Sequence, residues 1–190
     1  MKKLVILLVS ILSFNALFAK DTIPSKHYYL VFSARDFHLH PFSIGGHAFV
    51  SWTTKECNND TMISQQTLGF YPNPNSDVVK STLQFNQGRI MKGFNFNRKG
   101  MKLEQMTIEV DSATWVRSQQ IEMRWDRHEY NLLRSNCVSF IDKVAGLAKL
   151  KRIKTTKWKF IPVRPVKYIR KMVKKNHRKV VSTDTVCIVE

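Results

Sequence analysis

The hydrophobic pattern of this sequence changes its period at Asp111, and this change constrains the fold more than any other feature. Beyond that point, Asp111 and Ser112 are good N-caps and precede a stretch with few turn formers, which predicts a helix over about 113–127. Before it, aromatic and β-branched runs separated by turn residues predict strands, most clearly at 27–34, 46–54, 65–72 and 104–110, and more weakly at 80–85 and 89–96. Strands followed by helices, without alternation, predict an α+β fold.

Two segments on either side of this change are the most informative. Residues 46–72 predict a hairpin, and along its first strand Ala48, Val50 and Trp52 alternate with a second set that places His47 on the opposite face. Later in the chain, apolar residues recur at helical spacing over 138–148, directly after Asn136. Asn136 is a good N-cap, so a second helix is predicted to begin at Cys137.

The N-terminus predicts export. Residues 1–19 consist of two lysines and an apolar run that ends in Ala19, the pattern of a secretory signal peptide cleaved after that residue. The alternative is an uncleaved membrane anchor, for which the run is short. We therefore expect a signal peptide at 1–19, an α+β domain at 20–150, and a basic C-terminal extension at 151–190, in a protein that is periplasmic or secreted.

The net charge of +17 is concentrated near the C-terminus. Between Asp142 and Asp184 there are fifteen Lys and Arg and no acidic residue. Aromatic and apolar residues lie among these charges, and such a mixture predicts contact with an anionic membrane surface or an envelope polyanion. Charge alone would also suit nucleic acid, but export argues against it. The candidate contact residues are Lys157, Trp158, Lys159, Arg164, Lys167, Arg170, Lys171, Lys174 and Lys175. The alternative is a solvated extension that packs one aromatic edge on the core.

Cys137 has three possible roles: a core residue, half of a disulfide, or a nucleophile. In the first turn of a helix, unpaired backbone N–H groups and the helix dipole favour a thiolate and lower the pKa of the thiol. A nucleophilic thiolate also needs a base, and the candidate is His47, which follows Gly45–Gly46. A small buried cysteine and a surface histidine remain the alternatives.

The other cysteines and histidines predict no cofactor. Cys57 and Cys187 could pair in an oxidising compartment and leave Cys137 as a thiol, because three cysteines leave at least one unpaired in the monomer. His38 and His40 lack the accompanying acidic or histidine partners that a metal site needs, so no metal is expected.

Three quoted stretches together carry a family resemblance: GHAFVSW at 46–52, LGFYP at 68–72 and YNLLRSNCVSFIDKVAG at 130–146. In this order they resemble the circularly permuted papain-like group, the arm of the NlpC/P60 superfamily in which histidine precedes cysteine, as in lecithin:retinol acyltransferase-like proteins. The resemblance covers residues 27–148. It implies a small antiparallel sheet with packed helices, and a thiol hydrolase or acyltransferase with Cys137 as nucleophile and His47 as base. Peptide, peptidoglycan and lipid substrates remain undistinguished.

The resemblance also implies a third polar residue that orients the histidine from the following strand. Gln66 and Tyr71 are the candidates there, besides a main-chain carbonyl. Tyr130 and Asn136 could support the thiol, or serve only in packing and capping. The alternative function is a non-catalytic, cationic protein that binds the envelope or a membrane. The sequence does not determine the oligomeric state.

Overall fold

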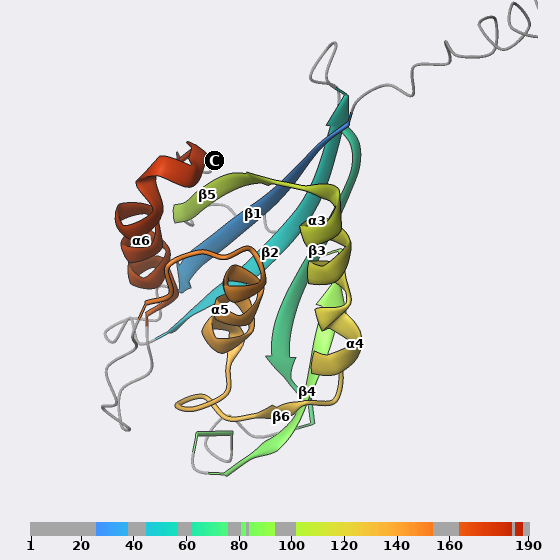
Figure 1. The fold of residues 1–190 in the computed structure, drawn as a ribbon. Helices are drawn as coiled ribbons and strands as arrows, with labels where there is room; N and C mark the ends of the chain where they lie inside the picture. The colour runs from blue at the N-terminus through green and yellow to red at the C-terminus, as the bar shows by residue number, and fades with distance from the viewer. Residues whose placement is uncertain are drawn as a thin grey trace, which may run out of the picture.

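The computed structural model describes residues 26–37, 45–56, 62–75, 81–82, 84–93, 102–153, 164–183 and 185–187. The predicted signal peptide lies outside this part of the chain. The elements follow one another in the order β1 (Lys26–Phe37), β2 (Gly45–Glu56), β3 (Met62–Pro72), β4 (Asn86–Lys92), β5 (Lys102–Val110), α3 (Ser112–Gln119), α4 (Ile121–Trp125), β6 (Glu129–Tyr130), α5 (Cys137–Leu147), α6 (Pro165–Asn176), the 3-10 helix η1 (His177–Lys179), β7 (Val180–Ser182) and β8 (Thr185–Cys187) (Figure 1).

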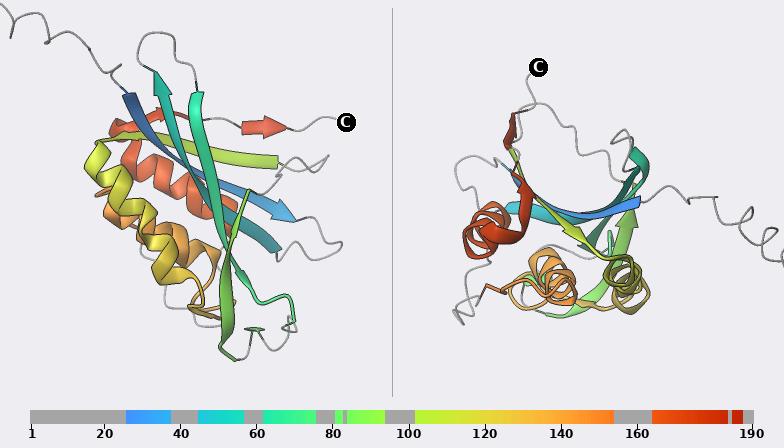
Figure 2. Two further views of the ribbon diagram at one scale, coloured as in Figure 1. Left: turned by 90° about the vertical axis from the view of Figure 1, so that its right-hand side faces the viewer. Right: turned by 45° about the horizontal axis from the view of Figure 1, so that its top comes forward.

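The strands form an antiparallel sheet in the order β6-β4-β3-β2-β1-β5-β7, and β8 also pairs with β5. The helices cover one face of this twisted sheet, with α6 near β1 and β5, α5 near β2, and α4 beside β4 (Figure 2). Every strand pairing is antiparallel. The predicted α+β class, with an antiparallel sheet and packed helices, is therefore confirmed.

The predicted alternation along β2 is also confirmed. Ala48, Val50 and Trp52 are fully buried in the core between the sheet and the helices. The indole Nε1 of Trp52 donates a hydrogen bond to Ser118 Oγ at 2.6 Å, which fastens α3 to the sheet. The side chain of His47 consequently projects from the other face of β2.

Two local predictions differ from the structure. The helix expected over 113–127 is two helices, α3 and α4, that meet at Gln120. The weak strand expected at 80–85 includes Ser81 and Thr82, which lie in a helical turn. Pro165, in the basic extension, begins α6, where its missing N–H and restricted φ suit the first helical turn.

The extension packs against the domain through α6. Tyr168, Ile169 and Met172 of this helix are buried against β1 and β5, which agrees with the alternative that the extension packs on the core. Gly46 permits this packing, because a Cβ there would lie 3.0 Å from the Pro165 ring and 2.7 Å from a main-chain oxygen of β1. Within the described ranges, no helix is long and apolar enough to cross a membrane.

Candidate active site

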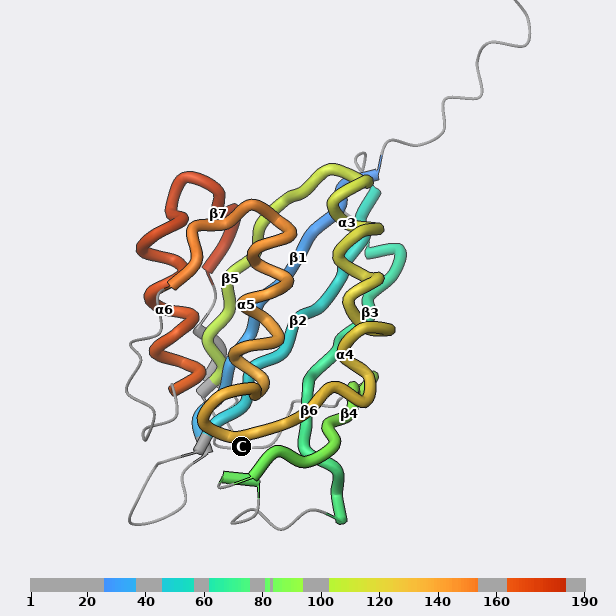
Figure 3. Tube along the Cα trace, turned by 60° about the horizontal axis from the view of Figure 1, so that its bottom comes forward, coloured from blue at the N-terminus to red at the C-terminus, as the bar shows by residue number. Residues whose placement is uncertain are grey.

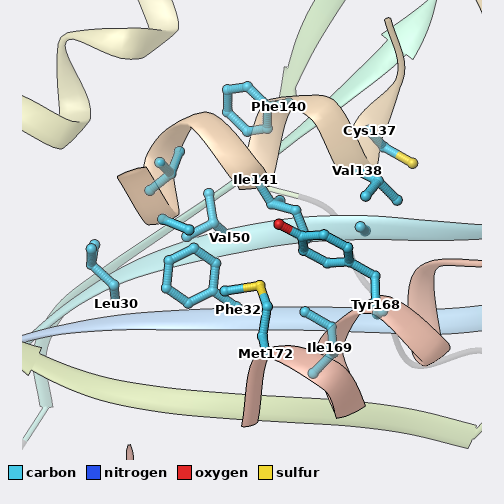
Figure 4. Packing of buried hydrophobic residues seen from close by; sticks show 14 of the residues in the cluster. Leu30, Phe32, Val50, Cys137, Val138, Phe140, Ile141, Tyr168, Ile169 and Met172 are labelled. Carbon is cyan, nitrogen blue, oxygen red and sulfur yellow. The ribbon is translucent and has the colours of Figure 1, made fainter. Parts of the chain in front are cut away.

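Cys137 is the first residue of α5, as predicted. Asn136 caps this helix: its Oδ1 accepts hydrogen bonds from the backbone N–H groups of Val138 at 2.9 Å and Ser139 at 3.2 Å. Asn136 Nδ2 donates to the carbonyl of Leu132 at 2.7 Å, which ties the cap to the preceding turn. The side chain of Cys137 is only 6% exposed and lies at the opposite end of the buried cluster from Leu30 (Figure 4).

His47 lies on β2 in a tightly enclosed position. Its ring stacks on the ring of Tyr71 at 3.9 Å between centroids. Gly69 on β3 makes room for it, because a Cβ at Gly69 would lie 2.7 Å from Nε2 of His47. Arg35 is the residue directly opposite on β1 and is also buried. Among the residues that the structure describes, no group forms a hydrogen bond with the buried Nε2 of His47.

The backbone of Ala48 connects the cysteine to the histidine strand. Its N–H group faces the sulfur of Cys137 closely enough to lower the pKa of the thiol, so the sulfur lies against the peptide unit that follows His47. Pairing between β2 and β3 begins only at Phe49 and Gly69, although both strands continue past these residues toward the site. The sulfur therefore meets β2 where this strand is not paired with β3. The tube view of Figure 3 shows the start of α5 at this end of β2.

Burial governs the protonation of both groups. It raises the pKa of the Cys137 thiol to about 11, and hydrogen bonds from the backbone N–H groups of Ala48, Val138 and Cys137 itself oppose this shift without outweighing it. Burial, together with the charge of Arg35, lowers the pKa of His47 to about 3. The prediction that the helix N-terminus lowers the pKa of the thiol is therefore wrong for the net shift, because desolvation of the charged form dominates. At neutral pH, both groups are uncharged.

Two predicted supporting residues, Tyr71 and Tyr130, lie in the same neighbourhood. Burial raises the pKa of each, and the charge of the Cys137 thiolate adds to the shift in both. Tyr130 packs at 5.3 Å between centroids on Phe70, a core residue of β3. Gln66 is different: it pairs with Trp52, so it faces the side of the hairpin away from His47. Of the two residues predicted to orient the histidine, Tyr71 is thus the one that contacts it.

The predicted surface-binding residues fall into three groups. Lys157, Trp158 and Lys159 lie outside the described residues. Three others make contacts within the fold: Arg164 with Asp36 at 3.4 Å, Arg170 with Glu104 at 2.6 Å, and Lys175 with the carbonyl of Arg152 at 3.0 Å. The side chains of Lys167, Lys171 and Lys174 are exposed on α6.

Arg35 is the residue of this neighbourhood that sequence reasoning missed. Along β1, Phe32 and Ala34 face the core, so the alternation of side chains places Arg35 on the opposite face of the sheet, together with His47. This alternation is the feature of the sequence that could have identified Arg35.

No group of three or more potential metal ligands occurs among the described residues, and His38 and His40 lie outside them. Cys57 also lies outside, and only the backbone of Cys187 is described, so their pairing stays a prediction.

The described cavities lie elsewhere on the molecule. One of about 450 Å³ lies between α3–α4 and α5, and is lined by Arg117, Gln120, Ile121, Arg124, Trp125, Lys143 and Leu147. A second, of about 300 Å³, lies beside β5 and Lys179. Neither is lined by Cys137 or His47, which are enclosed by their own neighbours.

Comparisons with known proteins give one structural likeness. No protein-family model matches the sequence, and no curated protein matches it. Among solved structures, the chain is similar to the crystal structure of the type VI secretion system effector TseH, with a TM-score of 0.48 and 15% sequence identity over 83% of this chain and 98% of that one. The described part of the chain has an α+β arrangement in which Cys137 begins a helix packed on the sheet that carries His47.

Proposed function

We propose that this chain is an exported, thiol-dependent hydrolase or acyltransferase of the permuted papain-like group, acting on an amide or ester bond of a cell-envelope substrate. One observation carries the proposal. The N–H group directly after His47 faces the sulfur of Cys137, and the buried Nε2 of that histidine has no hydrogen-bond partner among the described residues. A buried polar atom without a partner is rare in proteins, and a role in proton transfer explains it.

In this mechanism Cys137 attacks the acyl carbonyl. In the resting structure the sulfur makes no hydrogen bond with Nε2 of His47, so the thiol proton passes to Nε2 only after substrate binding has brought the two groups into contact. The Asn136 cap already occupies the N–H groups of Val138 and Ser139, so the N–H group of Cys137 stabilises the oxyanion as the carbon–sulfur bond forms. The imidazolium then protonates the leaving amine or alcohol, and a thioester remains on Cys137. Water or a second acceptor, deprotonated by His47, attacks this thioester and releases the thiol.

The resting protonation state shows what substrate binding must accomplish. With a thiol pKa of about 11 and an imidazole pKa of about 3, proton transfer from Cys137 to His47 is strongly uphill. Both shifts arise mainly from desolvation, so polar groups of a substrate that enter the site would move the two values toward each other. Cys137 would therefore be inert as a nucleophile until a substrate is bound.

Thioester turnover tests the proposal. We expect Cys137→Ala to abolish the turnover of acyl thioesters and the covalent labelling of the protein by an acyl probe, with no loss of thermal stability. The matched control is Cys57→Ala/Cys187→Ala, which leaves Cys137 as the sole cysteine of the chain and should retain both activities. His47→Gln should reduce turnover by about 10²–10⁴-fold. Equal turnover by the Cys137→Ala protein would rule the proposal out.

A cationic binding function is the second candidate, favoured by the exposed lysines of α6. Because the apolar residues of this helix are buried, any contact with an anionic membrane would be electrostatic, without insertion. We expect co-sedimentation with vesicles containing phosphatidylglycerol at low salt, and its loss at high salt or when Lys167, Lys171 and Lys174 are changed to Glu. Changing Lys26, Arg89 and Arg124 to Glu gives a control of equal charge. If both triple variants behave alike, α6 is not a binding surface.

A further inference from the structure

A cavity of about 450 Å³ lies between α3–α4 and α5, which run side by side over the sheet (Figure 1). The residues that form its floor are apolar: Ile121 and Trp125 are buried, and Leu147 is partly buried. The volume is within the range of small-molecule sites, about 300–1,000 Å³. Neither Cys137 nor His47 lines this cavity, so a ligand bound here would not depend on the proposed chemistry.

A cationic rim, formed by Arg117, Arg124 and Lys143, surrounds this floor. The two arginines lie in the last turns of α3 and α4, and the lysine comes from α5. All three residues are exposed, and among the described residues that line the cavity none is acidic. In the described part of the chain, no ion pair or side-chain hydrogen bond holds any of the three. The cavity therefore presents positive charge over an apolar surface.

Acidic residues of the same helices are bound elsewhere. Glu122 of α4 forms an ion pair with Lys92 of β4 at 2.6 Å. Asp111 accepts hydrogen bonds from the backbone N–H and the hydroxyl of Thr114, and these bonds, with a smaller effect of Arg117, lower its pKa. The charges of the cationic rim consequently repel one another, and an anion bound among them would remove this repulsion.

Helix dipoles explain only part of this arrangement. A cation in the last turn of a helix is stabilised by the negative end of the dipole, and Arg117 and Arg124 hold such positions. Lys143 does not, because it lies before the last turn of α5. The dipoles therefore do not explain why a cation from α5 lines the same apolar cavity as the two arginines. A ligand with a negative charge does.

We propose that this cavity binds an amphipathic anion, a small molecule in which a phosphate group is attached to an apolar chain. Guanidinium groups bind phosphate through paired hydrogen bonds, so the anionic end would lie within the cationic rim. The apolar chain would cover Ile121, Trp125 and Leu147 and leave contact with water. Free phosphate would use the rim alone, and an apolar cation would use the floor alone. Rim and floor together select molecules that carry both groups.

Isothermal titration calorimetry with octyl phosphate tests the inference. Octyl phosphate, kept below the concentration at which it forms micelles, carries both groups. Inorganic phosphate lacks the chain, and octyltrimethylammonium has the chain with the opposite charge. We expect octyl phosphate to bind with one-to-one stoichiometry and about tenfold or more tightly than either of the others, because it alone contacts both rim and floor. Equal affinity for octyl phosphate and inorganic phosphate would overturn the inference.

Single substitutions show whether octyl phosphate binds at the cationic rim. Arg124→Gln and Lys143→Gln should each weaken its binding by about tenfold, since each removes one charged contact. Arg178→Gln and Lys171→Gln are the matched controls, because these exposed residues of η1 and α6 lie outside the cavity. Equal loss of affinity in all four variants would show a general attraction to a basic protein and would overturn the inference.

Thermal unfolding separates ligand binding from a structural role. Without ligand, Lys143→Gln should leave the midpoint unchanged or raise it, since the change relieves repulsion within the cationic rim. Octyl phosphate should raise the midpoint of the unchanged protein and of Cys137→Ala alike, and should raise that of Lys143→Gln less. This result does not depend on whether Cys137 is a nucleophile. A lower midpoint for Lys143→Gln, with unchanged affinity for octyl phosphate, would assign the lysine to the fold and overturn the inference.

Discussion

Met172→Ala is expected to lower the free energy of unfolding by about 2–5 kcal/mol, the usual cost of truncating a fully buried methionine. Met172 lies in the core cluster, in which α6 packs against β1 and β5 (Figure 4). Its loss would remove apolar area from the core and leave a cavity between helix and sheet. On this view, the C-terminal helix is part of the folding unit.

Equilibrium denaturation in urea measures this effect. The control is Lys171→Ala, which changes the neighbouring exposed residue of the same helix and should alter the free energy by less than about 0.5 kcal/mol. The denaturant dependence should stay the same in both variants, since the same surface is exposed on unfolding. Similar small effects from both substitutions would mean that α6 does not belong to the cooperative core.

Acidification is expected to destabilise the protein through His47. In the folded state the pKa of His47 is about 3, against an ordinary value of 6.5. Between these values the unfolded chain binds a proton that the folded protein does not, so the free energy of unfolding falls as the pH is lowered through this window. The slope is at most about 1.4 kcal/mol per pH unit. Above the ordinary value both states are neutral, and this contribution to the pH dependence disappears.

His47→Gln isolates this contribution, because glutamine does not titrate. Denaturation curves recorded between neutral pH and pH about 3.5 should show a shallower loss of stability for this variant than for the unchanged protein. His27→Gln is the control, since His27 is partly exposed on β1 and pairs with Glu109. If His47→Gln and the unchanged protein lose stability in parallel, His47 is not buried in its neutral form.

Much of the candidate site could be predicted from short stretches of sequence. The N-cap at Asn136, the helix after it, and the face of β2 that carries His47 all follow from local rules of capping and alternation. These rules depend on residues within one or two turns or along one strand, so they hold before the tertiary fold is known. The α+β order of the elements follows in the same way.

The C-terminal helix could not be predicted in the same way. Its many lysines and arginines made 164–179 look like a solvated extension, and the apolar residues among them looked suited to a membrane. Only the open face of the sheet beside β1 and β5 shows where Tyr168, Ile169 and Met172 are buried. A helix of this kind is stabilised mostly by tertiary packing of one apolar face, and sequence alone does not reveal the partner of that face.

The sequence by itself determined the N-caps of α3 and α5, the side of β2 that carries His47, and that a histidine precedes a cysteine along the chain. The tertiary structure alone decided that both are buried and uncharged, that Arg35 lies opposite the imidazole, and that the amide of Ala48 meets the sulfur. The physical reason is that capping and alternation act over a few residues. Desolvation, which controls protonation here, depends on everything that the folded chain brings around a group.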